Sequence, residues 1–145
     1  MDDLEQARIR LEAEAVTEIV QVCETGSWML LNSDIIEFEV DRHSDLFKKE
    51  LVLAVLARAK AYISTRPEIE QRAEYLMRLS FKFHDALHLA FAEAGDADVF
   101  LTTDDRLLRK AKQHSNVIKV VVENPAIWLI NTLQSETEAN EANGN

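Results

Sequence analysis

Three acidic side chains lie close to the ends of predicted helices and strands. Asp85 is near the start of an apolar helix, Asp104 follows the apolar segment DVFLTT, and Glu39 lies on a helix that begins at Ser33. The edge of an α/β sheet where strands end is the usual place for a ligand. Carboxylates that converge on one point repel each other and need a hard cation, Mg²⁺ or Mn²⁺. The pattern predicts a metal site in which a bound water attacks a phosphodiester.

Each of these acids also has a simpler structural interpretation. Asp85 and Asp104 are placed where an aspartate caps a helix by accepting hydrogen bonds from backbone N–H groups. Glu39 is placed as a solvent-facing glutamate of an amphipathic helix. A carboxylate has more lone pairs than one N–H uses, so capping and metal binding can coexist. Both interpretations remain open at this point.

Residues next to Asp104 extend the candidate site. Asp105 is a further, weaker candidate for a metal ligand. Thr102 and Thr103 contribute hydroxyl groups that could orient a phosphate or a metal-bound water. These side chains are therefore expected around the substrate.

Two histidines flank Asp85 at positions i and i+4, in the order His84-Asp85-Ala86-Leu87-His88. This spacing is similar to the zinc-protease pattern HExxH, with aspartate in place of glutamate. Aspartate is one methylene shorter than the usual general base, and no third ligand follows at the expected distance. We expect buried or supporting histidines here, and no zinc.

The elements expected to position these residues alternate between helix and strand, which favours an α/β fold with a mainly parallel sheet of about four strands and right-handed crossovers. The helix at 45–58 has many apolar positions and is expected to face the core. Helices are predicted at 3–25, 33–40, 45–58, 67–79, 84–94, 106–113 and 125–129, and strands at 27–31, 60–64, 98–102 and 117–122.

Length and composition indicate one soluble domain at 1–133 and a disordered acidic tail at 134–145. No apolar run approaches the ~18 residues of a membrane span, and no signal peptide is recognisable. The single cysteine, Cys23, fits a reducing cytoplasm. The formal net charge of −10 argues against passive binding of nucleic acid. It leaves open a nuclease whose bound metal supplies positive charge.

The segment DALHLAFAEAGDADVFLTTDDRLL, followed by a strand and then NPAIWL, resembles the C-terminal half of a PIN domain. Upstream, RIRLEAEAV and SDIIEFEV resemble the rest of the same family, so the resemblance runs from about Leu4 to Ile130. It implies a three-layer α/β/α fold and a prokaryotic protein. It also implies a Mg²⁺-dependent or Mn²⁺-dependent endoribonuclease of the kind found as the toxin of a toxin–antitoxin pair.

The resemblance assigns roles residue by residue. It implies Glu39, Asp85 and Asp104 as the catalytic metal ligands, with Asp105 a weaker candidate. Thr102 would be the hydroxyl near them. Asn124-Pro125 would form a structural corner. The substrate would be single-stranded RNA, and an antitoxin-like protein or a second copy of the chain would be the partner.

The sequence departs from the family pattern at its N-terminus. A PIN domain begins with a central strand that ends in an aspartate, whereas this sequence enters its first helix near Asp3. The departure predicts unpaired strand edges in mid-sheet and an impaired or inactive nuclease. The alternative, from another class, is a non-catalytic interaction module that binds an antitoxin-like protein or itself.

Overall fold

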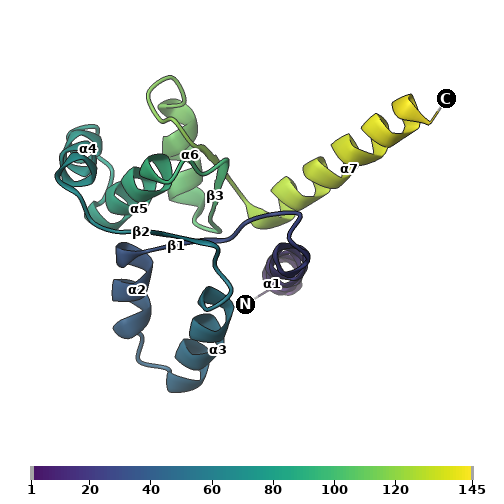
Figure 1. The fold of residues 1–145 in the computed structure, drawn as a ribbon, viewed down its shortest axis with the longest axis horizontal. Coiled ribbons are helices and arrows are strands. Elements are labelled where there is room, and N and C mark those ends of the chain that lie inside the picture. The colour runs from purple at the N-terminus through teal and green to yellow at the C-terminus, as the bar shows by residue number, and fades with distance from the viewer. Residues whose placement is uncertain (1, 145) are drawn as a thin grey trace.

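Most of the helices begin where a side chain supplies an acceptor for free backbone N–H groups. The structure is a computed structural model that describes residues 2–144. These residues form seven helices and four short strands. Figure 1 shows the arrangement. The elements are α1 Asp3–Thr25, β1 Leu31–Ser33, α2 Asp34–Asp41, α3 Leu46–Leu56, β2 Ala61–Ile63, α4 Pro67–Arg78, α5 Phe83–Ala94, β3 Val99–Leu101, α6 Asp105–Gln113, β4 Val121–Glu123 and α7 Pro125–Asn143.

Side-chain caps set most of these helix starts. Ser33 accepts a hydrogen bond from the N–H of Ile36 at the start of α2, and Asp104 caps α6, as predicted. The cap of α3 is Asp45, one residue after the expected Ser44. At the other end of α1, Gly26 adopts a φ of 88°, which a residue without Cβ reaches without strain.

The four strands of residues 2–144 form two separate parallel pairs. Leu31 pairs with Ala61 in the first, and Val99 pairs with Val121 in the second. The predicted parallel direction is confirmed within each pair. Within residues 2–144 these pairs do not form one continuous sheet, because no strand of this range joins β1 to β3.

Two strands are shifted along the chain from the predicted ranges. The first was expected at 27–31 and lies at Leu31–Ser33, and the last was expected at 117–122 and lies at Val121–Glu123. Each strand has one neighbour, so only the residues opposite that neighbour form a ladder. The apolar residues upstream, with no strand beside them, stay outside regular structure.

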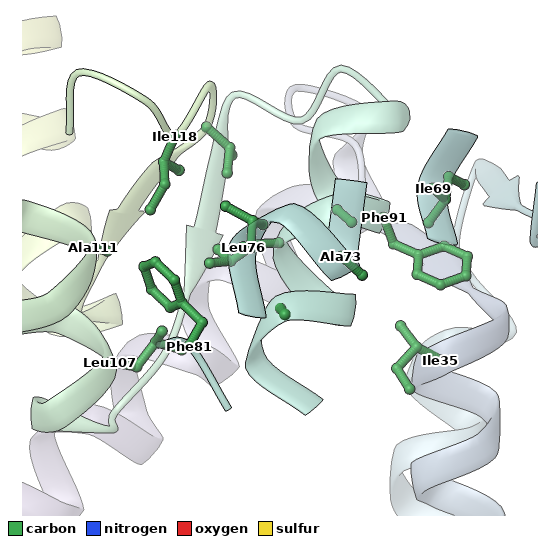
Figure 2. Close-up of a cluster of buried hydrophobic side chains, with 13 residues drawn as sticks. Ile35, Ile69, Ala73, Leu76, Phe81, Phe91, Leu107, Ala111 and Ile118 are labelled. Atoms are coloured by element: carbon green, nitrogen blue, oxygen red, sulfur yellow. The ribbon is translucent and has the colours of Figure 1, made fainter. Parts of the chain in front are cut away.

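The core lies around α4 and α5. Leu76 and Leu89 are fully buried where these helices pack together. Figure 2 shows Phe81 beside Leu107 at one end of the cluster. Buried side chains from α2, α6 and the segment before β4 complete it, so α5 is held on several sides.

The expectation that 45–58 faces the core is wrong. No residue of α3 is buried, and Leu46 and Phe47 are each 71% exposed. Figure 1 shows α2 and α3 as a pair of helices extending from β1 and β2, away from α4 and α5. An apolar helix can bury its side chains only against a neighbour, and α3 packs mainly on α2.

The C-terminal segment differs from the expected disordered tail. α7 continues as an exposed helix through Asn143, and Figure 1 shows it projecting from the body of the protein. Its first turns pack against α1, and the rings of Trp28 and Trp128 meet edge to face with centroids 4.8 Å apart. Within residues 2–144, no helix is both long and apolar enough to cross a membrane.

Candidate functional site

α5 carries Asp85 in its first turn, and both ends of this helix are fixed. The start follows buried Phe81. Near the end, the carboxylate of Glu93 accepts hydrogen bonds from Arg72 Nε at 2.7 Å and from the N–H of Lys119 at 2.7 Å. These bonds join α5 to α4 and to the segment before β4. The backbone that presents Asp85 is therefore well held.

The Asp85 carboxyl is half-buried, and its pKa is raised. Burial is the largest cause, because it disfavours the charged form. The negative charges of Asp104 and then Glu39 raise the pKa further, while Lys82 and His88 partly offset the effect. Acids from α2 and from the end of β3 thus act electrostatically on the acid of α5.

Glu39 is held by the two histidines of α5. His88 Nε2 lies 2.7 Å from one of its carboxylate oxygens, and His84 Nδ1 lies 3.5 Å from the other. The i and i+4 spacing that is similar to a zinc motif therefore turns both imidazoles toward one glutamate on α2. The sequence indicated supporting histidines and did not identify Glu39 as their partner.

The start of α2 is tied to the loop after β2. Asp34 accepts hydrogen bonds from the Tyr62 hydroxyl at 2.5 Å, from the Thr65 N–H at 2.6 Å and from the Thr65 hydroxyl at 2.7 Å. These bonds lower the pKa of Asp34 and raise the pKa of Tyr62 to about 12. They set the position of the helix that presents Glu39.

Asp104 lies past β3 and caps α6 with one of its two carboxylate oxygens. Oδ1 accepts from the N–H groups of Arg106 at 3.0 Å and Leu107 at 3.3 Å. The Thr102 hydroxyl accepts from the N–H of Asp104 at 3.1 Å, which shapes the turn, and Thr103 is exposed. The cap and a ligand role use different lone pairs, so Oδ2 remains for a cation.

Asp105 points to a different partner. Arg8 on α1 forms a two-pronged ion pair with it, at 2.8 Å and 2.6 Å. This pair lowers the pKa of Asp105. Asp105 is not among the groups that shift the pKa of Asp85. Glu39 and Asp104 therefore act electrostatically on Asp85. Asp105 instead forms an ion pair that joins α1 to α6.

A buried polar pair on α1 and α7 was not anticipated from the sequence. Glu12 is 8% exposed and accepts a hydrogen bond from Asn124 Nδ2 at 2.5 Å, as well as one from Arg8 Nε at 3.1 Å. Asn124 also caps α7 through the N–H groups of Ala126 and Ile127. Asn124-Pro125, where a structural corner was expected, lies between the end of β4 and the start of α7, and the Asn124 side chain connects this point to α1.

The three acids have the right donor atoms for a divalent cation, but their side chains are too far apart to hold one ion together. Carboxylate oxygens are the donors that Mg²⁺ and Mn²⁺ prefer, and a cation would offset the repulsion from Asp104 and Glu39 that adds to the effect of burial on the pKa of Asp85. In the described part of the chain, however, no three His, Cys, Asp or Glu side chains lie close enough to hold one ion. Binding would require the side chains to close in.

Comparison of the chain with protein-family models, with curated proteins and with solved structures found no match.

Proposed function

We propose that this chain is a PIN-like domain of the toxin type, a Mg²⁺-dependent or Mn²⁺-dependent endoribonuclease that acts on single-stranded RNA in the cytoplasm. Glu39, Asp85 and Asp104 would hold the ion. In the same proposal, the two parallel strand pairs belong to a three-layer α/β/α fold whose sheet is interrupted between β1 and β3. We expect low activity, because a site of three carboxylates binds a divalent cation more weakly than a site with more charged ligands.

The observation that carries this proposal is that α2, α5 and the turn after β3 each present an acid, and that Asp104 and Glu39 act electrostatically on the half-buried Asp85. A carboxyl that is half-buried and faces two further acids is destabilised in its charged form, and such perturbation clusters at functional sites. The three acids come from α2, α5 and the loop after β3, so no single helix explains their approach. A bound cation would favour all three charged forms at once.

The roles of the residues follow from their contacts. His88 holds Glu39 through one carboxylate oxygen and so limits the directions the other can take. Asp104 is fixed by its cap bonds through Oδ1 and presents Oδ2. Asp85 is the half-buried acid of the three, and a cation would favour its charged form. The cation, when bound, would supply an activated water and the positive charge that an acidic protein needs near RNA.

Cleavage of a fluorescent single-stranded RNA tests the proposal. We expect Mg²⁺-dependent cleavage that EDTA abolishes and that Asp85→Asn lowers about a hundredfold or to background. Glu70→Gln, an exposed change on α4, is the matched control and should cleave like the parent. Equal rates for the parent and Asp85→Asn would refute the catalytic assignment.

A second function, a non-catalytic interaction module, is favoured by the exposed apolar surface of α3. Leu46, Phe47 and Leu51 are each more than half exposed on a helix with no buried residue. Patches of this kind mark interaction sites for another protein, here an antitoxin-like partner or a second copy. Self-association that Phe47→Ser removes, with no effect of Mg²⁺ on the melting temperature, would support this function over the nuclease.

A further inference from the structure

A groove separates the two strand pairs. One wall is formed by residues 27–33, which lead into and include β1, and the other by residues 97–101, which lead into and include β3. We call this space the strand groove. Its volume is about 620 Å³. Because neither β1 nor β3 has a second strand beside it in residues 2–144, each has one open edge.

The backbone of β1 directs hydrogen-bonding groups away from β2. The carbonyl of Leu30 accepts from the N–H of Lys60 at 3.1 Å, so this carbonyl points to β2. Across a trans peptide bond, the following N–H points the opposite way. The N–H of Leu31 is therefore on the open edge. The next N–H on the same edge is that of Ser33, and it donates a hydrogen bond to Asn32 Oδ1 at 2.8 Å.

The same reasoning applies to β3. The N–H of Thr102 donates to the carbonyl of Glu123 at 3.0 Å and so points to β4. The preceding carbonyl, that of Leu101, points away from β4. Leu31 and Leu101 both line the strand groove. A donor on one wall and an acceptor on the other thus belong to unpaired strand edges, which are templates for an added strand.

Most side chains that line the groove are apolar, and the lining includes two acids. Asp96 and Asp98 lie at the end where β3 begins. His88, which binds Glu39, lines it too and connects it to the acid cluster. No lysine or arginine of the described residues is in the lining. The apolar lining includes Ile19, Trp28, Leu31, Ile63, Phe91, Phe100 and Trp128.

We propose that the strand groove binds an extended apolar segment of a partner protein, flanked by lysine or arginine, which pairs with β1 and β3 and joins the two strand pairs into one sheet. Backbone pairing on both sides supplies affinity, and the apolar walls accept the side chains. The acids at the groove favour basic flanks. A second copy of this chain carries a net charge of −10, which opposes its entry. This proposal does not depend on the nuclease.

Two signals of the unmodified protein report on the groove. Cys23 is the single cysteine and lines it, so alkylation of Cys23 measures access. Amide hydrogen exchange at Leu31 measures pairing of the open edge. The probe is a synthetic peptide of about five central valines with two lysines on each side, the usual length of a strand. We expect it to slow both alkylation of Cys23 and exchange at Leu31 at least about tenfold.

Two control peptides separate strand pairing from mere apolar contact. The first has alternate backbone nitrogens methylated, which removes donors and keeps the side chains. The second has glutamates in place of lysines. We expect neither to protect Leu31. Equal protection by the methylated peptide would overturn strand pairing, and equal protection by the glutamate peptide would overturn the basic flanks.

Two substitutions at one position sharpen the test. Leu31→Pro removes the N–H on the open edge and keeps the carbonyl of Leu30 for β2, a location where strands tolerate proline. Leu31→Ala shortens the side chain and keeps the N–H. We expect Leu31→Pro to lose peptide protection of Cys23 and Leu31→Ala to retain most of it. If Leu31→Pro does not fold, the methylated peptide still decides the question.

Dependence on protein concentration provides the remaining test. If Cys23 becomes protected as the protein alone is concentrated, a second copy fills the groove and the proposed partner is wrong. If the lysine-flanked peptide protects neither Cys23 nor the Leu31 amide at a large molar excess, the proposal is overturned as well.

Discussion

The Nε2 atom of His88 lies 2.7 Å from a carboxylate oxygen of Glu39, so α5 and α2 are joined by a short polar contact. Replacing His88 with leucine removes this bond and leaves Glu39 beside an apolar group. We expect the free energy of unfolding to fall by about 1–2 kcal/mol, measured by urea denaturation. His84→Ala is the control, because its distance is 3.5 Å and its side chain is 60% exposed. An equal loss in both variants would contradict this assignment.

The raised pKa of Asp85 makes stability depend on pH in a defined direction. In the unfolded chain the carboxyl ionises near the ordinary value of about 3.9, and in the folded protein it ionises at higher pH. The contribution of this group is therefore fully present below about pH 3.9 and is lost as pH rises through the folded pKa. Asp85→Asn should gain stability relative to the parent over that interval.

Urea denaturation of both proteins across mildly acidic to neutral pH checks this expectation. Parallel stability profiles would show that Asp85 is not destabilised when charged. Under the proposed function, Mg²⁺ should also raise the melting temperature of the parent at neutral pH and leave that of Asp85→Asn unchanged.

Asn124 serves two elements, so its replacement should be costly. Asn124→Ala removes the cap of α7 and leaves the buried carboxylate of Glu12 without one of its donors. We expect a loss of about 2–4 kcal/mol in the free energy of unfolding. Asn116→Ala, at an exposed loop residue, is the control. A loss below about 1 kcal/mol would mean that the cap acts alone.

Gly95 lies where the end of α5 touches β2. A Cβ at this position would stand 2.8 Å and 2.9 Å from side-chain carbons of Ile63. Gly95→Ala should therefore cost about 1–3 kcal/mol through overpacking. Adding Ile63→Val removes the nearer carbon and should recover part of the loss. Thermal denaturation of the parent, the two single variants and the double variant tests this reason. If the changes in stability caused by the two substitutions were additive, overpacking against Ile63 would be contradicted.

The helices could be predicted because their signals are local. Ser33, Gly26 and Asp104 mark helix ends within a few residues of the groups that they satisfy. The burial of α3 could not be predicted, because an apolar pattern does not say whether a neighbouring element exists. The strand ranges shifted for a related reason, since a ladder depends on a partner elsewhere in the chain.

The candidate site shows the same division. Asp85 and Asp104 could be placed from the sequence by their positions at element ends, whereas the pattern around Glu39 also fitted a solvent-facing glutamate. The ion pair of Arg8 with Asp105 joins residues separated by 97 positions. No local pattern encodes such a contact, so its effect on Asp105 emerged only from the structure.

The two separate strand pairs also bear on how the chain folds. β1 and β2 flank α2 and α3, and β3 and β4 flank α6, so each ladder joins neighbouring parts of the chain. Low contact order of this kind favours fast folding. The most distant contacts are those of α1 with α6 and α7. Closure of the N-terminal helix onto the C-terminal one is therefore the step that carries the largest loop entropy.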